Sequence, residues 1–279
     1  MGQASSNFSS FSSRDDQSIA HAKTIRSRYT SMGETHPIHP HELELKSYQK
    51  PYICDGCKEL GFGARYRCDK CNFDLHQDCM LAAPIAHHDF FKNSTFKIFH
   101  QPPQKCSRYC QDCQRYCDAC GQPVRGFSYH CEKEGWDLHP CCRNLPSILP
   151  INNIKFKLRD KVSSKCIGCN KKNLEGTVSR IRGWSYVSEC KKYHFHVHCA
   201  MDMVIDAWRN GAFNSHDGNS LVALENLELP LLRQYLSGNR RRSSKFMKVV
   251  KIVFKTIAGI LLGDPTVVFT GIVVDLVAN

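Results

Sequence analysis

The pattern of apolar and polar residues divides the chain into regions of different character. Residues 1–35 are Ser-rich and polar, show no sustained period, and are predicted to be disordered. Residues 36–215 hold only short apolar runs, of which 64–67 predicts a strand and 199–208 a short helix. After a linker at 216–239, apolar residues recur at helical spacing within residues 240–279. The pattern therefore predicts small α+β modules, followed by an amphipathic helical segment.

Modules this small bury too little apolar surface to fold without another source of stability. The composition suggests that source, because the chain contains 17 Cys and 14 His. Thiolate and imidazole ligands select zinc, and a Cys-x2-Cys pair binds one ion from a tight turn. A structural zinc site supplies roughly 10–16 kcal/mol of apparent binding free energy. Zinc is therefore the predicted cofactor.

The densest group of candidate ligands lies between residues 41 and 87. Its spacings are those of zinc sites, and its eight members are His41, Cys54, Cys57, Cys68, Cys71, His76, Cys79 and His87. Eight ligands are enough for two tetrahedral sites.

Three blocks, residues 36–90, 91–150 and 151–215, share landmarks at fixed offsets. Each has a Gly-x-x-Tyr signal, with a His ten residues after the Tyr and a Cys three residues after that His. A Cys-x2-Cys pair precedes each Gly, so one ligand quartet recurs in every block. The quartets are Cys54, Cys57, His76 and Cys79; Cys117, Cys120, His139 and Cys142; and Cys166, Cys169, His196 and Cys199.

The second set of ligands is complete only in the first block. In the second block Glu134 stands at the position of Cys71, while Gln104 falls at the position of His41 with His100 nearby. In the third block Ser188 and Lys191 occupy the two inner Cys positions. The spacings predict about four zinc ions per chain. A fifth, in the second block, stays open because that block has three spare thiols, Cys106, Cys110 and Cys113.

The first residues contain no apolar stretch that could serve as a signal peptide, and the number of Cys is odd. Both features favour a reducing compartment and metal thiolates over disulfides, so a cytoplasmic location is expected. The run Arg240-Arg241-Arg242 leaves the nucleus as an alternative. The net charge of +12 makes an anionic partner plausible: nucleic acid, a membrane surface or an acidic protein.

The C-terminal region 240–279 combines basic and apolar residues on a predicted helix. Its lysines fall on one face and its apolar residues on the other: Lys245, Lys248, Lys251 and Lys255 against Phe246, Val249, Val250, Val253, Ile257 and Ile260. This pattern is typical of a helix lying on a membrane or of a calmodulin target. Packing on the third zinc block, or self-association, is an equally weighted alternative. A spanning helix is disfavoured, because charged residues interrupt every run of the required length.

The N-terminal residues match a lipidation pattern. Gly2 follows Met1 and precedes Ser6 at the spacing of an N-myristoylation signal. One acyl chain with a basic patch can anchor a protein peripherally. Gly2 is therefore the lipidation candidate.

The quoted motifs resemble the divergent C1 (DC1) cysteine/histidine-rich repeats of plant proteins, relatives of the diacylglycerol-binding module of protein kinase C. The resemblance covers about residues 36–205. It is carried by Tyr52-x-Cys54-x2-Cys57, by Tyr66-x-Cys68-x2-Cys71-x-Phe73-x-Leu75-His76-x2-Cys79, and by Gly135-Trp-Asp-Leu-His139-Pro-Cys-Cys142. It implies three tandem C1-like zinc repeats with a role in signalling or stress response.

The resemblance also implies an interleaved ligand pairing in the first block. One zinc takes Cys54, Cys57, His76 and Cys79, and the other takes His41, Cys68, Cys71 and His87. The loop at 58–67 is shorter than in the lipid-binding members and lacks their Gln-Gly step, which argues against diacylglycerol as a ligand.

The motifs give catalysis no support. The chain contains no Gly-rich phosphate loop, no Gly-x-Ser-x-Gly elbow and no His-Glu-x2-His motif, and a four-ligand zinc site has no open position. The leading hypothesis is a non-enzymatic zinc-binding adaptor with an unknown protein partner, located at a membrane face of the cytoplasm. The alternatives are a nucleic-acid-binding zinc-finger protein and, more weakly, a thiol-redox enzyme using Cys117 and Cys120.

Overall fold

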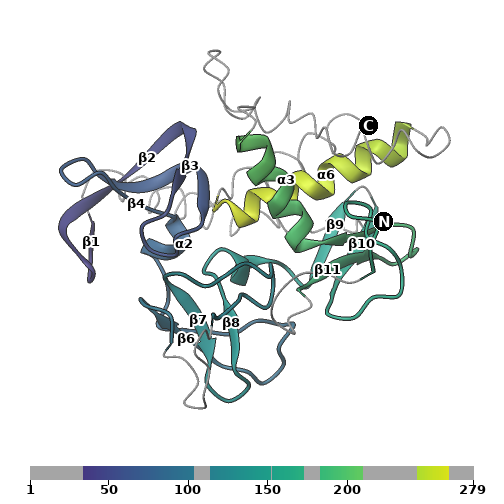
Figure 1. Ribbon diagram of the computed structural model, residues 1–279, viewed down its shortest axis with the longest axis horizontal. Coiled ribbons are helices and arrows are strands. Elements are labelled where there is room, and N and C mark those ends of the chain that lie inside the picture. The colour runs from purple at the N-terminus through teal and green to yellow at the C-terminus, as the bar shows by residue number, and fades with distance from the viewer. Residues whose placement is uncertain (1–33, 104–113, 152, 173–182, 210–243, 264–279) are drawn as a thin grey trace, which may run out of the picture.

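The computed structural model describes residues 34–103, 114–151, 153–172, 183–209 and 244–263 (Figure 1). Within them, three four-stranded antiparallel sheets follow one another along the chain, each in sequential strand order. The first sheet comprises β1 (Glu34–His36), β2 (His39–Ile53), β3 (Leu60–Cys68) and β4 (Phe73–Leu75). The second comprises β5 (Ile85–Ala86), β6 (Phe96–Phe99), β7 (Ser128–Cys131) and β8 (Trp136–Leu138). The third comprises β9 (Ile148–Ile151), β10 (Ile154–Arg159), β11 (Ser185–Ser188) and β12 (His194–His196).

The last hairpin of each sheet has the same register. The Tyr of the Gly-x-x-Tyr signal pairs with the residue directly before the ligand His: Tyr66 with Leu75, Tyr129 with Leu138, and Tyr186 with Phe195. All six side chains are buried. The sequence landmarks therefore correspond to a hairpin that recurs in all three sheets. This hairpin fixes both the buried Tyr and the ligand His.

The sheets divide the chain slightly earlier than the predicted block boundaries. Strand β5 lies in the first block by sequence but pairs with β6 of the second sheet. Strand β9, apart from Ile151, lies in the second block but pairs with β10 of the third. After the first and the second His-x2-Cys, the chain thus crosses to the next sheet and forms its edge strand.

A helix follows the ligand His of each sheet, and its length differs. It is four residues in α2 (Gln77–Met80), three in the 3-10 helix η1 (Cys142–Asn144) and thirteen in α3 (Val197–Arg209). The predicted helix at 199–208 is confirmed within α3, and the predicted strand at 64–67 within β3.

Two apolar clusters form the core. The smaller cluster lies in the first block and consists mainly of Leu43, Tyr52, Tyr66, Leu75 and Met80 around four Cys, with Phe127 added from the second block. The larger cluster joins the second and third blocks, Leu60 and Phe62 of the first block, and the C-terminal helix. The second and third blocks and α6 therefore share one core, to which the first block also contributes, while the first block keeps a smaller cluster of its own.

Helix α6 (Ser244–Leu261) connects the third sheet to the first (Figure 1). Near its start, Phe246 stacks on Tyr193 with ring centroids 5.0 Å apart, and farther along Phe254 meets Phe195 edge-on at 4.9 Å. Just beyond its end, the Leu262 carbonyl accepts a hydrogen bond from Phe62 N (3.2 Å). The helix therefore bridges blocks that are distant in sequence.

The two faces of α6 have different environments. The apolar residues Val249, Val253 and Ile257 are fully buried against the blocks, whereas Lys248 and Lys251 are exposed. Of the alternatives left open by the sequence, the structure thus presents the helix packed on the zinc blocks. No described helix combines the length and apolar character needed to cross a bilayer. The predictions for residues 1–33, including Gly2, and for the linker at 216–239 lie outside the described residues.

Candidate metal centres

Four clusters of Cys and His side chains could each hold a metal ion. In each, the ligand atoms lie within 4.8 Å of one another. Three clusters are the recurring quartets: Cys54, Cys57, His76 and Cys79; Cys117, Cys120, His139 and Cys142; and Cys166, Cys169, His196 and Cys199. The fourth is His39, His41, Cys68 and Cys71.

The three recurring quartets have nearly the same geometry. In the first, His76 Nδ1 lies 3.3 Å from Cys57 Sγ and 3.8 Å from Cys79 Sγ, and the His76 backbone N–H donates to Cys54 Sγ at 3.4 Å. The corresponding distances are 3.4, 3.9 and 3.5 Å around His139. Around His196 they are 3.3, 3.5 and 3.4 Å. In every case the three sulfurs gather on the Nδ1 side of the ring.

The other ring nitrogen of each His faces a backbone carbonyl three residues after the second Cys of the pair. Nε2 of His76 lies 3.3 Å from Leu60 O, that of His139 3.3 Å from Pro123 O, and that of His196 3.1 Å from Lys172 O. A carbonyl at this place fixes the Nε2–H tautomer, which leaves the Nδ1 lone pair for a metal. The quartets are therefore pre-oriented as ligands.

The Cys-x2-Cys turns are built by a left-handed residue. Lys58, Gly121 and Asn170 follow the second Cys of each pair with φ of 66°, 71° and 57°. Each donates its N–H to the carbonyl of the first Cys, at 2.8–2.9 Å. This turn aims both thiols at one point. Positive φ is unfavourable for Lys, and the hydrogen bond from Lys58 N to Cys54 O holds the residue in this conformation.

Carboxylates brace the first two sites. Asp55 lies between the first two Cys and accepts from Asp74 N at 2.9 Å, while Asp74 forms ion pairs with Arg65 (3.1 Å) and Arg67 (2.7 Å). In the second block, Asp118 accepts from Asp137 N at 2.7 Å and Asp137 pairs with Arg115. Burial raises the pKa of Asp118 to about 7. The third block has Ile167 at this position.

These side chains fit zinc. Three sulfurs and one imidazole form a complete tetrahedral set with no open position, as in structural sites. The ligands are almost entirely buried, and every Cys among the described residues is a free thiol. When bound, zinc would join elements on either side of each turn and supply folding free energy.

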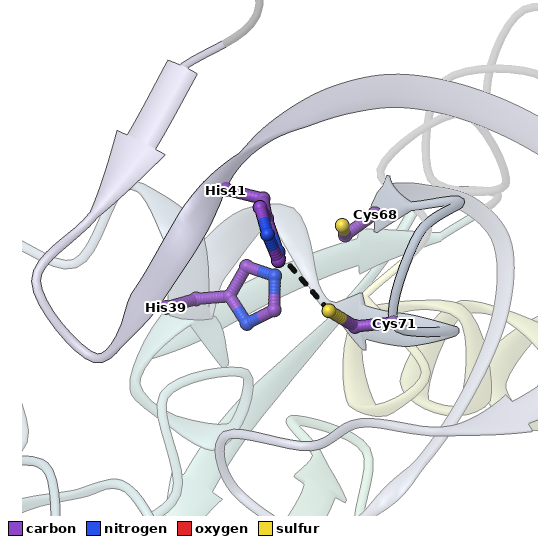
Figure 2. Close-up of side chains that lie close together, drawn as sticks. All are labelled: His39, His41, Cys68 and Cys71. Atoms are coloured by element: carbon purple, nitrogen blue, oxygen red, sulfur yellow. Dashed lines mark hydrogen bonds between the residues drawn. The ribbon is translucent and has the colours of Figure 1, made fainter.

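The fourth cluster lies between the start of β2 and the turn that joins β3 to β4 (Figure 2). His39 and His41 are two residues apart on β2, so their side chains share a face of the strand. Cys71 Sγ lies 3.0 Å from His41 Nδ1, and the His39 ring stacks on Phe73 at 4.3 Å. His39 Nε2 is buried without any hydrogen-bond partner among the described residues. A buried nitrogen without a partner is costly, and a metal ion would satisfy it.

The structure differs from the predicted second quartet in one member. His87 is exposed, and its Nδ1 lies 3.2 Å from Ser94 O, so it is not part of the cluster. His39 occupies the fourth position instead. The chain leaves the first sheet after α2 and enters the second at β5, which carries His87 away from β2. The alternating His-x-His pattern on a strand is the sequence signal that could have identified His39.

No second cluster occurs in the described parts of the second and third blocks. By strand register, the positions of His41 and Cys68 correspond to Ser94 and Cys131 in the second block, not to Gln104. In the third block they correspond to Ile154 and Ser188. His100 lies against His36 and Phe127 instead of a thiol. The spare thiols Cys106, Cys110 and Cys113 fall outside the described residues.

The Cys-x2-Cys turns also join neighbouring blocks, which the sequence did not reveal. Gly56, inside the first turn, accepts from Phe127 N of the second block at 3.0 Å. Ala119, at the same place in the second turn, accepts from Trp184 N of the third block at 2.8 Å. A Cβ added at Gly126 would lie 2.0 Å from Gly56 O, so only glycine permits this approach. The metal turns are thus also the docking points between blocks.

Comparison with known proteins gives partial matches. Residues 37–80 match the model of the C1 domain family. "Probable nucleoredoxin 1" of Arabidopsis thaliana is 41% identical over 66 residues, which is 21% of this chain and 11% of that protein. "Serine/threonine-protein kinase D2" of Homo sapiens is 37% identical over 54 residues, 18% of this chain and 6% of the kinase, and the rat protein matches to the same extent. The chain thus spans about a tenth or less of these relatives' length. No solved structure matches significantly.

Proposed function

Residues 37–80 form a C1 domain of the divergent DC1 type, a zinc-binding module, and from this premise we propose that the whole chain is a non-enzymatic adaptor built on zinc. In this proposal, three tandem C1-like blocks hold four zinc ions, one in each recurring quartet and one in the His39 cluster. The blocks and α6 then present one rigid surface to a protein partner in the cytoplasm.

The recurring quartet is the observation that carries the proposal. Its distances are reproduced in all three blocks to within a few tenths of an ångström. A catalytic zinc requires an open coordination position for its substrate, and the four ligands of this quartet leave none. The Cys pairs also lie with a His and a third Cys, an arrangement that favours metal binding over a redox dithiol. The blocks therefore support binding rather than catalysis.

Contact with an anionic membrane remains part of the proposal, but in a changed form. The apolar face of α6 packs on the blocks, so this face is not available for insertion while the helix is docked. The exposed Lys248 and Lys251 still face solvent and can contact anionic headgroups electrostatically. Together with myristoylation at Gly2, this contact would give peripheral attachment.

A test of the adaptor proposal compares zinc-loaded and zinc-free protein in a disulfide reductase assay. The proposal expects no turnover by the zinc-loaded chain above that of a Cys117→Ser/Cys120→Ser variant. Turnover that depends on these two thiols would establish the redox alternative. Vesicle flotation with Lys248→Glu/Lys251→Glu then tests the membrane contact, which should weaken with these changes and with salt.

Nucleic-acid binding is the second candidate, and the outer face of β10 favours it. Lys155, Lys157 and Arg159 point outward, while Phe156 and Leu158 between them are buried. An open hollow of about 440 Å³ beside this face is also lined by Lys161 and Lys191. If the face binds RNA or DNA, affinity should fall steeply with salt, and Lys155→Glu/Arg159→Glu should abolish binding. Binding that is insensitive to both would remove this candidate.

A further inference from the structure

The first and second blocks each place a side chain against the zinc-site His of the other. We infer that these two zinc centres are coupled by this exchange: Glu59 of the first block positions His139, and Cys141 of the second block positions His76. The inference rests on the proposed zinc scaffold and adds a link between two of its sites.

Glu59 is the residue that the first block contributes to the second site. It lies directly before β3 and is 8% exposed, which is rare for a carboxylate. Its Oε1 lies 3.5 Å from His139 Nε2 and has no hydrogen-bond partner among the described residues. A carboxylate beside the distal nitrogen of a ligand His orients the ring and increases its basicity toward the metal. Glu59 therefore lies where it can orient the His139 ring from across the junction, beside the Pro123 carbonyl that Nε2 also faces at 3.3 Å.

Cys141 is the residue that the second block contributes to the first site. It precedes the ligand Cys142 but belongs to none of the four clusters, and it is 2% exposed. Its thiol is buried near the His76 ring, because both lie beside Gly263. Gly263, after the end of α6, closes over both: a Cβ there would lie 2.8 Å from His76 Cδ2 and 3.4 Å from Cys141 Sγ. Cys141 thus holds the His76 ring in place from outside its own block.

The junction between these blocks fixes both contacts. The hydrogen bond from Phe127 N to Gly56 O and the close approach of Gly126 leave no room for the blocks to shift relative to one another. If either site loses its metal, its turn is no longer held, and the neighbouring His loses its positioning group. The first and second sites should therefore fill and empty together.

The third block provides an internal control. His196 Nε2 lies 3.1 Å from Lys172 O, as the other two His face carbonyls of their own blocks, but among the described residues no side chain of another block is paired with His196. The third block contacts the second through Trp184 N, which donates to Ala119 O, and through His198, whose Nδ1 lies 2.8 Å from Cys120 O. Neither contact involves the ring of the ligand His196. Zinc in the third quartet should therefore leave independently of the other two.

The experiment is a chelator titration of the full chain, followed by native mass spectrometry and site-resolved thiol labelling. N-ethylmaleimide labels the Cys of emptied sites, and peptide mapping separates Cys54/Cys79 from Cys117/Cys142 and Cys166/Cys199. In the unmodified chain, the first two pairs should become labelled at the same chelator concentration. Glu59→Gln should bring labelling of Cys117/Cys142 to a chelator concentration roughly 10- to 100-fold lower. Labelling of Cys166/Cys199 should move less than twofold.

Two further variants separate positioning from general destabilisation. Glu132→Gln removes a charge from an exposed ion pair with Lys97 in the second block and should move no site. Cys141→Ala should weaken the first site, read at Cys54/Cys79, and leave the third unchanged. Circular dichroism at full zinc loading checks the fold of each variant.

The outcomes are distinguishable. The coupling is overturned if Glu59→Gln and Cys141→Ala leave the chelator concentration for labelling unchanged at every site. It is also overturned if they lower this concentration equally at all three sites. In both cases the zinc scaffold itself stands. A chain that contains no zinc overturns the scaffold itself, and the coupling with it.

Discussion

The first and third blocks reach stability by different means. The first block holds two ligand clusters, and its own apolar cluster is small. The third block holds one ligand cluster, but α3 is thirteen residues long and α6 packs beside it, within the larger core. Where the first block has Cys68 and Cys71, the third has Ser188 and Lys191.

The comparison indicates that metal and apolar core substitute for one another along this chain. A small module that cannot bury enough surface needs metal, whereas one covered by two helices can dispense with a second site. The first block should therefore respond most to changes of ligand, and the third to changes in its helices.

The largest expected effect comes from removing a ligand of the buried site in the first block. His76→Ala or Cys79→Ser should release that zinc and unfold the block, because a structural site supplies roughly 10–16 kcal/mol. Hydrogen exchange resolved by residue should show lost protection in β2 to β4. Normal folding with an unchanged zinc content in either variant would contradict the ligand assignment.

The second cluster of the first block gives a matched pair of variants. His39→Ala should reduce the zinc content by one ion, because His39 Nε2 faces the cluster without another partner. His87→Ala should leave the zinc content unchanged, because His87 is exposed and contacts Ser94 O. Native mass spectrometry distinguishes the two. The reverse result would restore His87 as the ligand and remove His39.

The third block should instead depend on α6. Phe254 is 2% exposed and packs on Phe195, so Phe254→Ala should destabilise the chain by about 3–5 kcal/mol. Its zinc content should not change. The control Lys251→Ala, at an exposed position of the same helix, should stay within about 0.5 kcal/mol. A Phe254→Ala effect as small as that of Lys251→Ala in denaturant unfolding would show that α6 is not docked in solution.

The smallest effect concerns the carboxylate in the Cys-x2-Cys turn. Asp55 accepts from the backbone of Asp74, whereas the third block has Ile167 at that place. Asp55→Ala should cost about 1–3 kcal/mol, because it leaves a shielded N–H unpaired. Ile167→Ala removes no hydrogen bond of this kind and serves as the reference for side-chain truncation. Chelator midpoints of the two blocks give the comparison.

The sequence predicted the local part of the metal sites and failed where the chain crosses between sheets. The quartets around His76, His139 and His196 depend on a turn and a hairpin, so fixed spacings identify them. The fourth ligand beside Cys71 depends on which strand pairs with β3, whereas the ligand pairing implied by the resemblance had placed His87 there. The histidine that lies in this cluster is His39, which is two residues before His41 on β2 and shares a face of that strand with it.

The placement of α6 could not be predicted for a different reason. A helix with lysines on one face and Val, Ile and Phe on the other suits a membrane surface and a protein core equally well. The deciding contacts, such as Phe246 with Tyr193 and Leu262 with Phe62, join residues far apart in the sequence. The contacts that Glu59 and Cys141 make across the blocks could not be predicted for the same reason, because they also join residues far apart in the sequence.

The central claim, that zinc holds these blocks together, is tested most directly by native mass spectrometry of the full chain purified without added metal. We expect four zinc ions per chain, and three in His39→Ala. A chain that carries no zinc, or one ion at most, with its Cys residues paired as disulfides, would contradict it.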